Sequence, residues 1–254
     1  MGGSARAVQR GHGSPGMAIQ LRSIGVSFGG RAILDRLDLD IDAGGTTCIL
    51  GPSGIGKSTL LHRIAGLVSG DGSVHAADGR PLQGRIAWMG QTDLLLPWLN
   101  VRDNIMLGAR LRAEPYDLTR FSSLVLDVGL DDALTKRPAE LSGGMRQRAA
   151  LARTLMEDRP VVLMDEPFSS VDALARLRLQ DLGARLLAGR TVVMVTHDPW
   201  EAIRIGHRIL VLSGSPARIA LDLRPGEPRL PRAVDTPEAT RLWREIVSAL
   251  GIGT

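Results

Sequence analysis

Hydrophobic and polar positions along the first part of the chain alternate in short runs that are typical of β-strands. These runs predict strands at residues 19–26, 32–41 and 46–50. Glycine pairs at 29–30 and 44–45 separate the strands, as expected of turns. After residue 50 the sequence changes to a glycine-rich turn and then to a helical run at 57–65. The chain therefore begins with strands that lead into a strand, a loop and a helix.

A hairpin-like stretch at 71–84 and a further strand at 85–90 come next. Between residues 92 and 156 the apolar spacing becomes helical, with Pro97, Pro115 and Pro138 marking breaks. One helix face would carry Leu118, Phe121, Leu124, Val125 and Val128. We interpret this block as a helical insertion.

The strand pattern returns after the insertion and alternates with helices. The predicted strands are 161–164, 191–196 and 208–212, and the predicted helices are 173–187 and 199–205. This alternation is the pattern of a parallel sheet covered by helices, so the fold class is α/β.

The two ends of the chain have different sequence patterns from the middle. Residues 1–17 are rich in Gly, Ser and Arg without periodicity, which predicts a flexible leader outside the fold. A proline-rich tether at 224–232 precedes a final helix at 237–250, with Thr236 as its N-cap and Pro237 in its first turn. We divide the rest into a core of 18–91 and 157–212, a helical subdomain of 92–156, and a tail of 213–254.

Composition narrows the class of protein. Of the 254 residues 44% are apolar and 23% are charged, which is typical of a globular protein, and no apolar run reaches the length of about 18 residues that suggests a membrane span. The single cysteine, Cys48, excludes an intramolecular disulfide and suits a reducing cytoplasm. The net charge is +4, but the basic residues are dispersed, so we expect no nucleic-acid partner.

A phosphate-binding motif follows the strand at 46–50. Residues 51–58 read GPSGIGKS, a match to G-x-x-x-x-G-K-[ST] between a strand and a helix. Backbone N–H groups of such a loop surround phosphate, the lysine reaches the β and γ phosphates, and the hydroxyl supplies an oxygen to Mg²⁺. An ordinary glycine turn with a surface lysine is the alternative. The predicted nucleotide-binding residues are Gly51, Pro52, Ser53, Gly54, Ile55, Gly56, Lys57, Ser58 and Thr59.

Two acidic residues end the buried strand pattern at 161–164. Because Asp165 follows a parallel strand, we expect it beside the phosphate loop, where it can hold Mg²⁺ through water. Glu166 is then placed to act as general base for attack on the γ phosphate. A charged strand end without catalytic function is the alternative.

A second glycine-containing helix start points to a family. Residues 141–148 read LSGGMRQR, and together with the phosphate loop, Gln91, Asp165–Glu166, Asp172 and His197 they resemble the ATP-binding subunits of ABC transporters from residue 18 to about 212. The resemblance implies a P-loop NTPase of ABC type, with a mainly parallel sheet core, an antiparallel β subdomain and the helical insertion. It also implies a head-to-tail homodimer, in which each ATP lies between the Lys57 loop of one copy and Ser142, Gly143 and Gly144 of the other. A plain serine N-cap would explain Ser142 alone.

The same resemblance assigns further roles. Gln91 would sense the γ phosphate and Mg²⁺, Asp172 would contact the second copy, and His197 would bind the γ phosphate and order the attacking water. Phe28 stands where the family usually has the tyrosine that stacks on adenine, although it could instead pack within its hairpin. The cofactors implied are ATP and Mg²⁺.

The apolar stretch DLLLPWLNVRDNI at 93–105 is similar to the ATPases of nitrate, sulfonate, taurine and pyrimidine-precursor importers. In the family it forms part of the groove that receives a helix of the membrane permease, although it could also be core of the insertion. The implied partners are that permease and, indirectly, an extracellular or periplasmic solute-binding protein, with the chain on the cytoplasmic face of the membrane. The alternatives are a soluble ABC-type ATPase, as in iron–sulfur assembly, and another phosphate-loop enzyme, which would leave LSGGMRQR unexplained.

Overall fold

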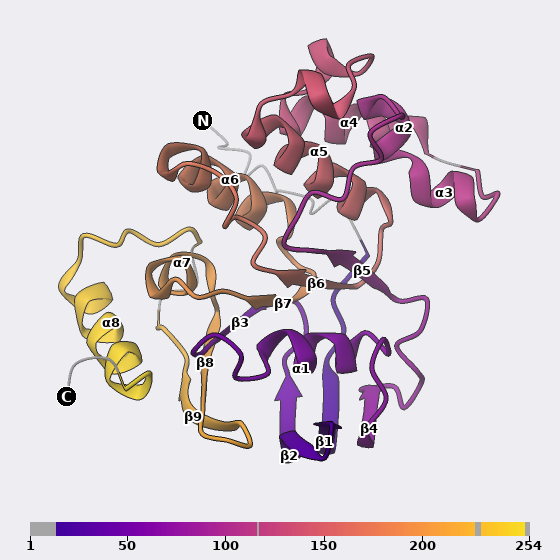
Figure 1. The fold of residues 1–254 in the computed structure, drawn as a ribbon. Helices are drawn as coiled ribbons and strands as arrows, with labels where there is room; N and C mark the ends of the chain where they lie inside the picture. The colour runs from indigo at the N-terminus through magenta and orange to yellow at the C-terminus, as the bar shows by residue number, and fades with distance from the viewer. Residues whose placement is uncertain (1–13, 116, 227–229, 252–254) are drawn as a thin grey trace, which may run out of the picture.

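Two β-sheets organise the chain in the computed structural model, which describes residues 14–115, 117–226 and 230–251 (Figure 1). The smaller sheet is antiparallel, with strand order β2-β1-β4. Its strands are β1 (Ile19–Phe28), β2 (Arg31–Ile41) and β4 (Asp71–Ala76). The hairpin expected at 71–84 is wrong, because β4 pairs with β1 and is followed by a turn that the Ala76 N–H closes on the Arg80 carbonyl.

The larger sheet has the strand order β5-β6-β7-β3-β8-β9 and is parallel except for its last strand. Its strands are β3 (Thr46–Leu50), β5 (Ile86–Met89), β6 (Val161–Asp165), β7 (Thr191–Val195), β8 (Arg208–Ser213) and β9 (Arg218–Leu223). The central strands are almost continuously apolar because both faces of a parallel sheet are covered.

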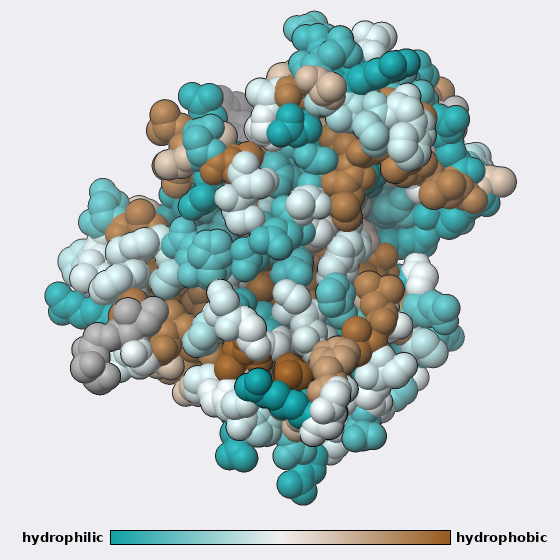
Figure 2. Space-filling view, viewed as in Figure 1, coloured by the Kyte–Doolittle hydropathy of each residue, from teal (hydrophilic) through white to brown (hydrophobic). Residues whose placement is uncertain are grey.

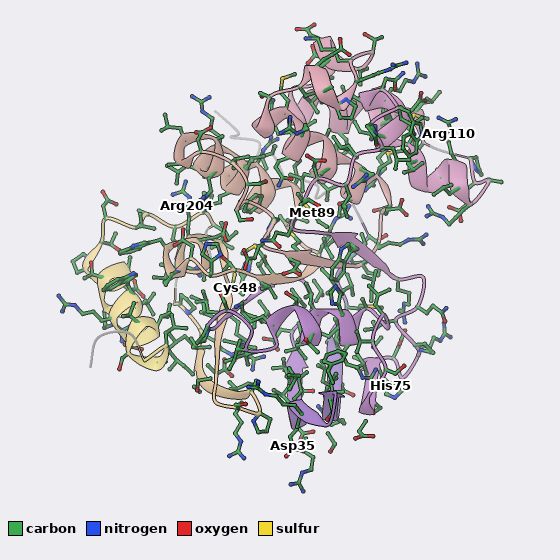
Figure 3. The ribbon with its side chains drawn as sticks, in the orientation of Figure 1. Asp35, Cys48, His75, Met89, Arg110 and Arg204 are labelled. Atoms are coloured by element: carbon green, nitrogen blue, oxygen red, sulfur yellow. The ribbon has the colours of Figure 1, made fainter. Side chains whose placement is uncertain are left out.

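The two faces of this sheet pack into different hydrophobic clusters. Cys48 and Leu50 point into the layer of helices α5 (Gly143–Met156), α6 (Ala173–Leu186) and α7 (Pro199–Ile205), whereas Ile49 points toward α1 (Lys57–Ile64) and the antiparallel sheet. Figure 1 shows these layers above and below the larger sheet. Figure 3 places Cys48 and Met89 in the interior, with the exposed Asp35, His75 and Arg110 at the periphery.

The helical insertion packs around a third hydrophobic cluster. Its helices are α2 (Val101–Ile105), α3 (Leu107–Leu111), α4 (Leu118–Val128) and α5, with single 3₁₀ turns at Asp131–Ala133 and Pro138–Glu140. On α4 the expected apolar face is buried except at Leu118, which is exposed. No helix in the described parts of the chain has the length and apolarity needed to cross a membrane.

The beginning of the described chain is part of the fold. Ser14 donates to Asp158, the Gly16 N–H bonds the Gly189 carbonyl at 2.8 Å, and the Thr191 hydroxyl donates to the Met17 carbonyl. The expected leader is therefore wrong for residues 14–17, and its first thirteen positions lie outside the described residues.

The end of the chain is also integrated. β9 pairs with β8, so the sheet continues beyond the boundary we placed at residue 212. The terminal helix α8 (Pro237–Ala249) has the predicted N-cap, because the Thr236 hydroxyl accepts the Ala239 N–H at 3.1 Å. α8 buries Ile246 in the same cluster as α7, and Trp243 stacks on Trp200 with ring centroids 5.8 Å apart.

We expect Ile246→Ala to lower the free energy of unfolding by about 2–5 kcal/mol, because it leaves a cavity beside the main core. Chemical denaturation measures the change, with Arg244→Ala on the exposed side of α8 as the control and a change within about 0.5 kcal/mol expected for it. Equal stability of the two variants would show that α8 does not contribute to the core.

Candidate functional site

The phosphate loop joins the end of β3 to the start of α1. Gly56 lies at the N-cap of α1 with a φ of 112°, and a Cβ there would come within 2.7 Å of Ile33 Cγ2. Only glycine satisfies both the positive φ and this close approach. The loop therefore leaves backbone N–H groups and the positive end of the α1 dipole directed at one place, which is an anion-binding arrangement.

Lys57 is folded over this loop. Its ammonium group donates to the carbonyls of Gly51 at 2.7 Å and Pro52 at 2.9 Å, and the residue is buried. Desolvation lowers the pKa of Lys57, while the negative charges of Glu166 and Asp165 act in the opposite direction. The two carboxyl groups therefore help to keep a positive charge inside the loop.

Ser58 and Asp165 meet across the base of the site. The Ser58 hydroxyl donates to Asp165 Oδ1 at 3.1 Å, which joins the first turn of α1 to the end of β6. Burial raises the pKa of Asp165, and the Ser58 hydrogen bond and nearby His62 lower it. These two oxygen-bearing groups are of the kind that Mg²⁺ prefers.

His62 is a neighbour of this site to which we assigned no role from the sequence. It lies one turn beyond Ser58 on α1 and stacks on Trp88 of β5, with ring centroids 5.0 Å apart and an interplanar angle of 19°. The four-residue spacing from Ser58 was the signal that places it on the same helix face.

Three predicted catalytic residues form one cluster beside the phosphate loop. His197 Nδ1 lies 3.0 Å from Glu166 Oε2, and Gln91 Nε2 lies 3.5 Å from the same oxygen. They follow β7, β6 and β5 respectively, so the parallel sheet brings them to one edge. Glu166 has a φ of 46°, an unusual backbone conformation for a glutamate, and its N–H is held by the Val195 carbonyl at 2.9 Å.

The LSGGMRQR segment forms the start of α5. Ser142 is its N-cap and accepts the Met145 N–H at 3.3 Å, so the plain capping interaction is present. A Cβ on Gly143 or Gly144 would meet its nearest neighbour only at 3.9 Å or 3.7 Å, which is ordinary contact. Nothing in the described part of the protomer therefore requires glycine at these two positions.

Two further predicted site residues, Asp172 and Phe28, lie in different elements and are not in contact with each other in the described structure. Asp172 is the N-cap of α6 and accepts the Ala175 N–H at 2.9 Å. Phe28 ends β1 and is 54% exposed, so it is not packed into its hairpin. A cavity of about 170 Å³ lies between this hairpin and the phosphate loop, lined by Arg31, Ala32, Ile33, Ser53, Gly54, Ile55, Gly214, Ser215 and Ala217.

The segment at 93–105 is held firmly while presenting apolar side chains outward. The Arg153 guanidinium donates to the carbonyls of Asp93 at 2.6 Å and Leu94 at 2.7 Å. Leu94 and Trp98 are 59% and 67% exposed, whereas Leu95 is buried in the insertion. Leu95 is therefore core of the insertion, whereas docking of a permease helix on this segment stays a prediction. Figure 2 shows patches of apolar surface on the helical insertion.

The chain is similar to known proteins over most of its length. The family described as "ABC transporter" matches residues 34–169. The aliphatic sulfonates import ATP-binding protein SsuB of Delftia acidovorans is 41% identical, covering 92% of this chain and 95% of that one. An uncharacterized ABC transporter ATP-binding protein of Haemophilus influenzae is 40% identical over 76% of this chain and 81% of that protein.

A solved structure has the same fold. It is the dimeric, post-hydrolysis state of the ATP-binding cassette MJ0796 with ADP and Pi, with a TM-score of 0.70, 27% identity, and coverage of 81% of this chain and 98% of that one. The family match spans more than half of the residues, and the ABC-type fold agrees with it. The chain therefore belongs to the ABC transporter family, as one of its ATPases.

Proposed function

We propose that this chain is the ATPase subunit of an importer for a small anionic nutrient, with aliphatic sulfonates as the best-supported class. The proposed ATPase activity is supported by one observation: Glu166, His197 and Gln91 lie in contact beside the phosphate loop. The import part is supported by relatives named for sulfonate import that match over nine-tenths of both lengths. Such relatives disfavour a soluble ABC-type ATPase of a non-transport complex.

The phosphate loop would hold the triphosphate of ATP. Backbone N–H groups of residues 51–59 would donate to its oxygens, and Lys57 would exchange its loop carbonyls for the β and γ phosphates. The half-exposed ring of Phe28 is available to stack on adenine.

Mg²⁺ fits the oxygen groups beside this loop. Ser58 and Asp165 already approach each other to 3.1 Å, and Gln91 lies near Glu166 on the same edge. The chemistry that Mg²⁺ would supply there is positive charge against the negative charge that develops during phosphoryl transfer. Ser58 would bind it directly, with Asp165 acting through water and Gln91 completing the site.

Glu166 is placed to act as general base. Water would attack the γ phosphorus, its proton would pass to the Glu166 carboxylate, and the bond to the β-phosphate oxygen would break to leave ADP and phosphate. His197, 3.0 Å from Glu166, would donate to the γ phosphate and orient the water.

A second copy of the chain would complete each site. Gly143 and Gly144 leave the start of α5 open, and ordinary contact within the protomer does not explain them. Phosphate approaching Ser142 and these glycines from another copy does explain them. Asp172, at the start of α6, would contact that copy. ATP would then favour the closed dimer, and hydrolysis would reset it.

The remaining partners belong to a membrane assembly. Leu94 and Trp98 are exposed on a rigidly held segment, which suits a helix of a permease docking there. The chain would then lie on the cytoplasmic face of the membrane, and a solute-binding protein would act on the opposite face without touching it.

We expect Glu166→Gln to abolish steady ATP hydrolysis while leaving ATP affinity within about twofold, because the amide cannot accept the proton. Lys57→Ala is the contrasting variant, with a large loss of ATP affinity itself. Single-turnover hydrolysis and equilibrium binding of a fluorescent ATP analogue separate the two effects. Normal turnover by Glu166→Gln would exclude it as the base.

We expect Ser142→Asp to be inactive although folded, because aspartate keeps the N-cap but repels the phosphate of the second copy. Mixed in equal amounts with inactive Glu166→Gln, it should restore about a quarter of the wild-type rate, since half of the dimers then contain one complete site of two. Persistent inactivity of a mixture that forms dimers would contradict sites shared between copies.

We expect an aliphatic sulfonate to raise the ATPase rate severalfold when the chain is reconstituted in vesicles with its permease and solute-binding protein. The sulfonate tested is an alkanesulfonate without an amino group, and nitrate, the aminosulfonate taurine and a pyrimidine precursor are the comparison solutes. Stimulation by one of these and not by the sulfonate would transfer the assignment to that solute. The Glu166→Gln assembly is the control for contaminating ATPases.

A further inference from the structure

A buried glutamate lies beneath the turn that carries His197. Glu201, in the first turn of α7, is only 5% exposed. Its Oε1 accepts a hydrogen bond at 3.1 Å from Gln180 Nε2 of α6, which is itself 2% exposed. Thr196, next to His197, lies at the same carboxyl group, whose pKa it lowers against the larger effect of burial, and shares the wall of a small cavity with Glu201. A carboxyl group at this depth requires an explanation, because burial of such a group is costly.

Capping of α7 does not explain it. Asp198 is the N-cap and Glu201 is three residues later, a spacing at which the glutamate normally bonds the N-cap N–H. Here the Asp198 N–H donates instead to the Thr196 hydroxyl oxygen at 3.1 Å. The only hydrogen of that hydroxyl is then free for Glu201. The Thr196 hydroxyl therefore stands between the backbone of Asp198, from which it accepts, and the carboxyl group of Glu201, toward which it can donate.

His197 lies between Thr196 and Asp198, which are joined by the hydrogen bond from the Asp198 N–H to the Thr196 hydroxyl. Its Nδ1 is 3.0 Å from Glu166 Oε2, while its side chain is otherwise 57% exposed. An exposed imidazole receives little support from packing, so the turn of residues 196–198 has to fix its position.

Glu166 and Glu201 both line one small cavity. It has a volume of about 10 Å³, close to the space of one water molecule, and Glu166, Thr196, His197, Asp198 and Glu201 contribute to its wall. Glu201 therefore reaches the same space as the Glu166–His197 pair.

A buried ion pair is not the explanation either. The nearby Arg176 guanidinium donates to the Phe168 carbonyl at 3.2 Å and lies 3.8 Å from Asp198. Gln180, which donates to Glu201, and Thr196 beside it are both neutral. Burial raises the pKa of Glu201. Stability alone would be served as well by an apolar side chain of similar volume at this place.

We propose that Glu201 is a positioning residue for hydrolysis, which acts through the Thr196 hydroxyl to hold the 196–198 turn and thereby keeps His197 against Glu166. This inference rests on the proposed role of His197 in the ATPase reaction. Glu201 itself touches neither the nucleotide nor the water.

The test compares Glu201→Ala, Glu201→Gln and Thr196→Val in the full assembly. We expect Glu201→Ala and Thr196→Val to lower kcat roughly 10- to 100-fold, with the KM for ATP within about twofold, because misplacement of a catalytic group affects the chemical step. Glu201→Gln keeps the shape and an acceptor oxygen and should recover most of the rate. Thr154→Val removes an equally buried hydroxyl elsewhere and should leave kcat unchanged.

Combining Glu201→Ala with His197→Ala in one enzyme distinguishes an effect of Glu201 on the position of His197 from a general effect on the structure. If Glu201 acts through His197, Glu201→Ala should slow the His197→Ala enzyme no further. Additive losses, or an unchanged kcat in Glu201→Ala and Thr196→Val, would overturn the proposal while leaving the proposed function intact. Wild-type hydrolysis by His197→Ala would overturn the role of His197 and this proposal together. Should Glu201→Ala fail to fold, Thr196→Val decides the question, alone and combined with His197→Ala.

Discussion

The site depends on the parallel pairing of β5, β6, β7 and β3. Met89 is paired with Met164, Asp165 with Val195, and Ile49 with Val195. In this register the four strands end at the same height in the sheet. The residues that follow them therefore lie close together at its carboxyl edge. The phosphate loop, the two acidic residues, the glutamine and the histidine are far apart in sequence and meet only because of this pairing. The carboxyl ends of parallel strands are where α/β proteins place ligands for this reason.

The same edge concentrates opposing electrostatic effects. Lys57 is buried yet lies near Glu166 and Asp165, which counter its desolvation, and Asp165 receives a hydrogen bond from Ser58. Glu166 adopts a positive φ that costs about 1–2 kcal/mol in a residue other than glycine. The bond from its N–H to the Val195 carbonyl of β7 holds it there. The rigid sheet thus supports an arrangement that a loop alone would not maintain.

Strongly patterned elements could be predicted from the sequence. β3 and α7 begin and end where the apolar runs and flanking turn residues indicated. The motifs also named the residues that form the Ser58–Asp165 and Glu166–His197 contacts, although not the contacts themselves. β9 was missed because an edge strand with alternate residues exposed carries a weak pattern, and local sequence does not indicate that it pairs with β8. Glu201 was missed because a glutamate three residues after an N-cap aspartate is the pattern of a capping interaction.

The stacking of Trp243 on Trp200 bears on how shortened forms of this protein should be interpreted. A fragment ending after β9 would retain every side chain assigned to nucleotide, metal or water, and by sequence it would look intact. It would nevertheless lack the indole that covers the outer side of α7, the helix that begins next to His197. Slow turnover by such a fragment would then reflect lost packing against α7 and the main core rather than a missing catalytic group.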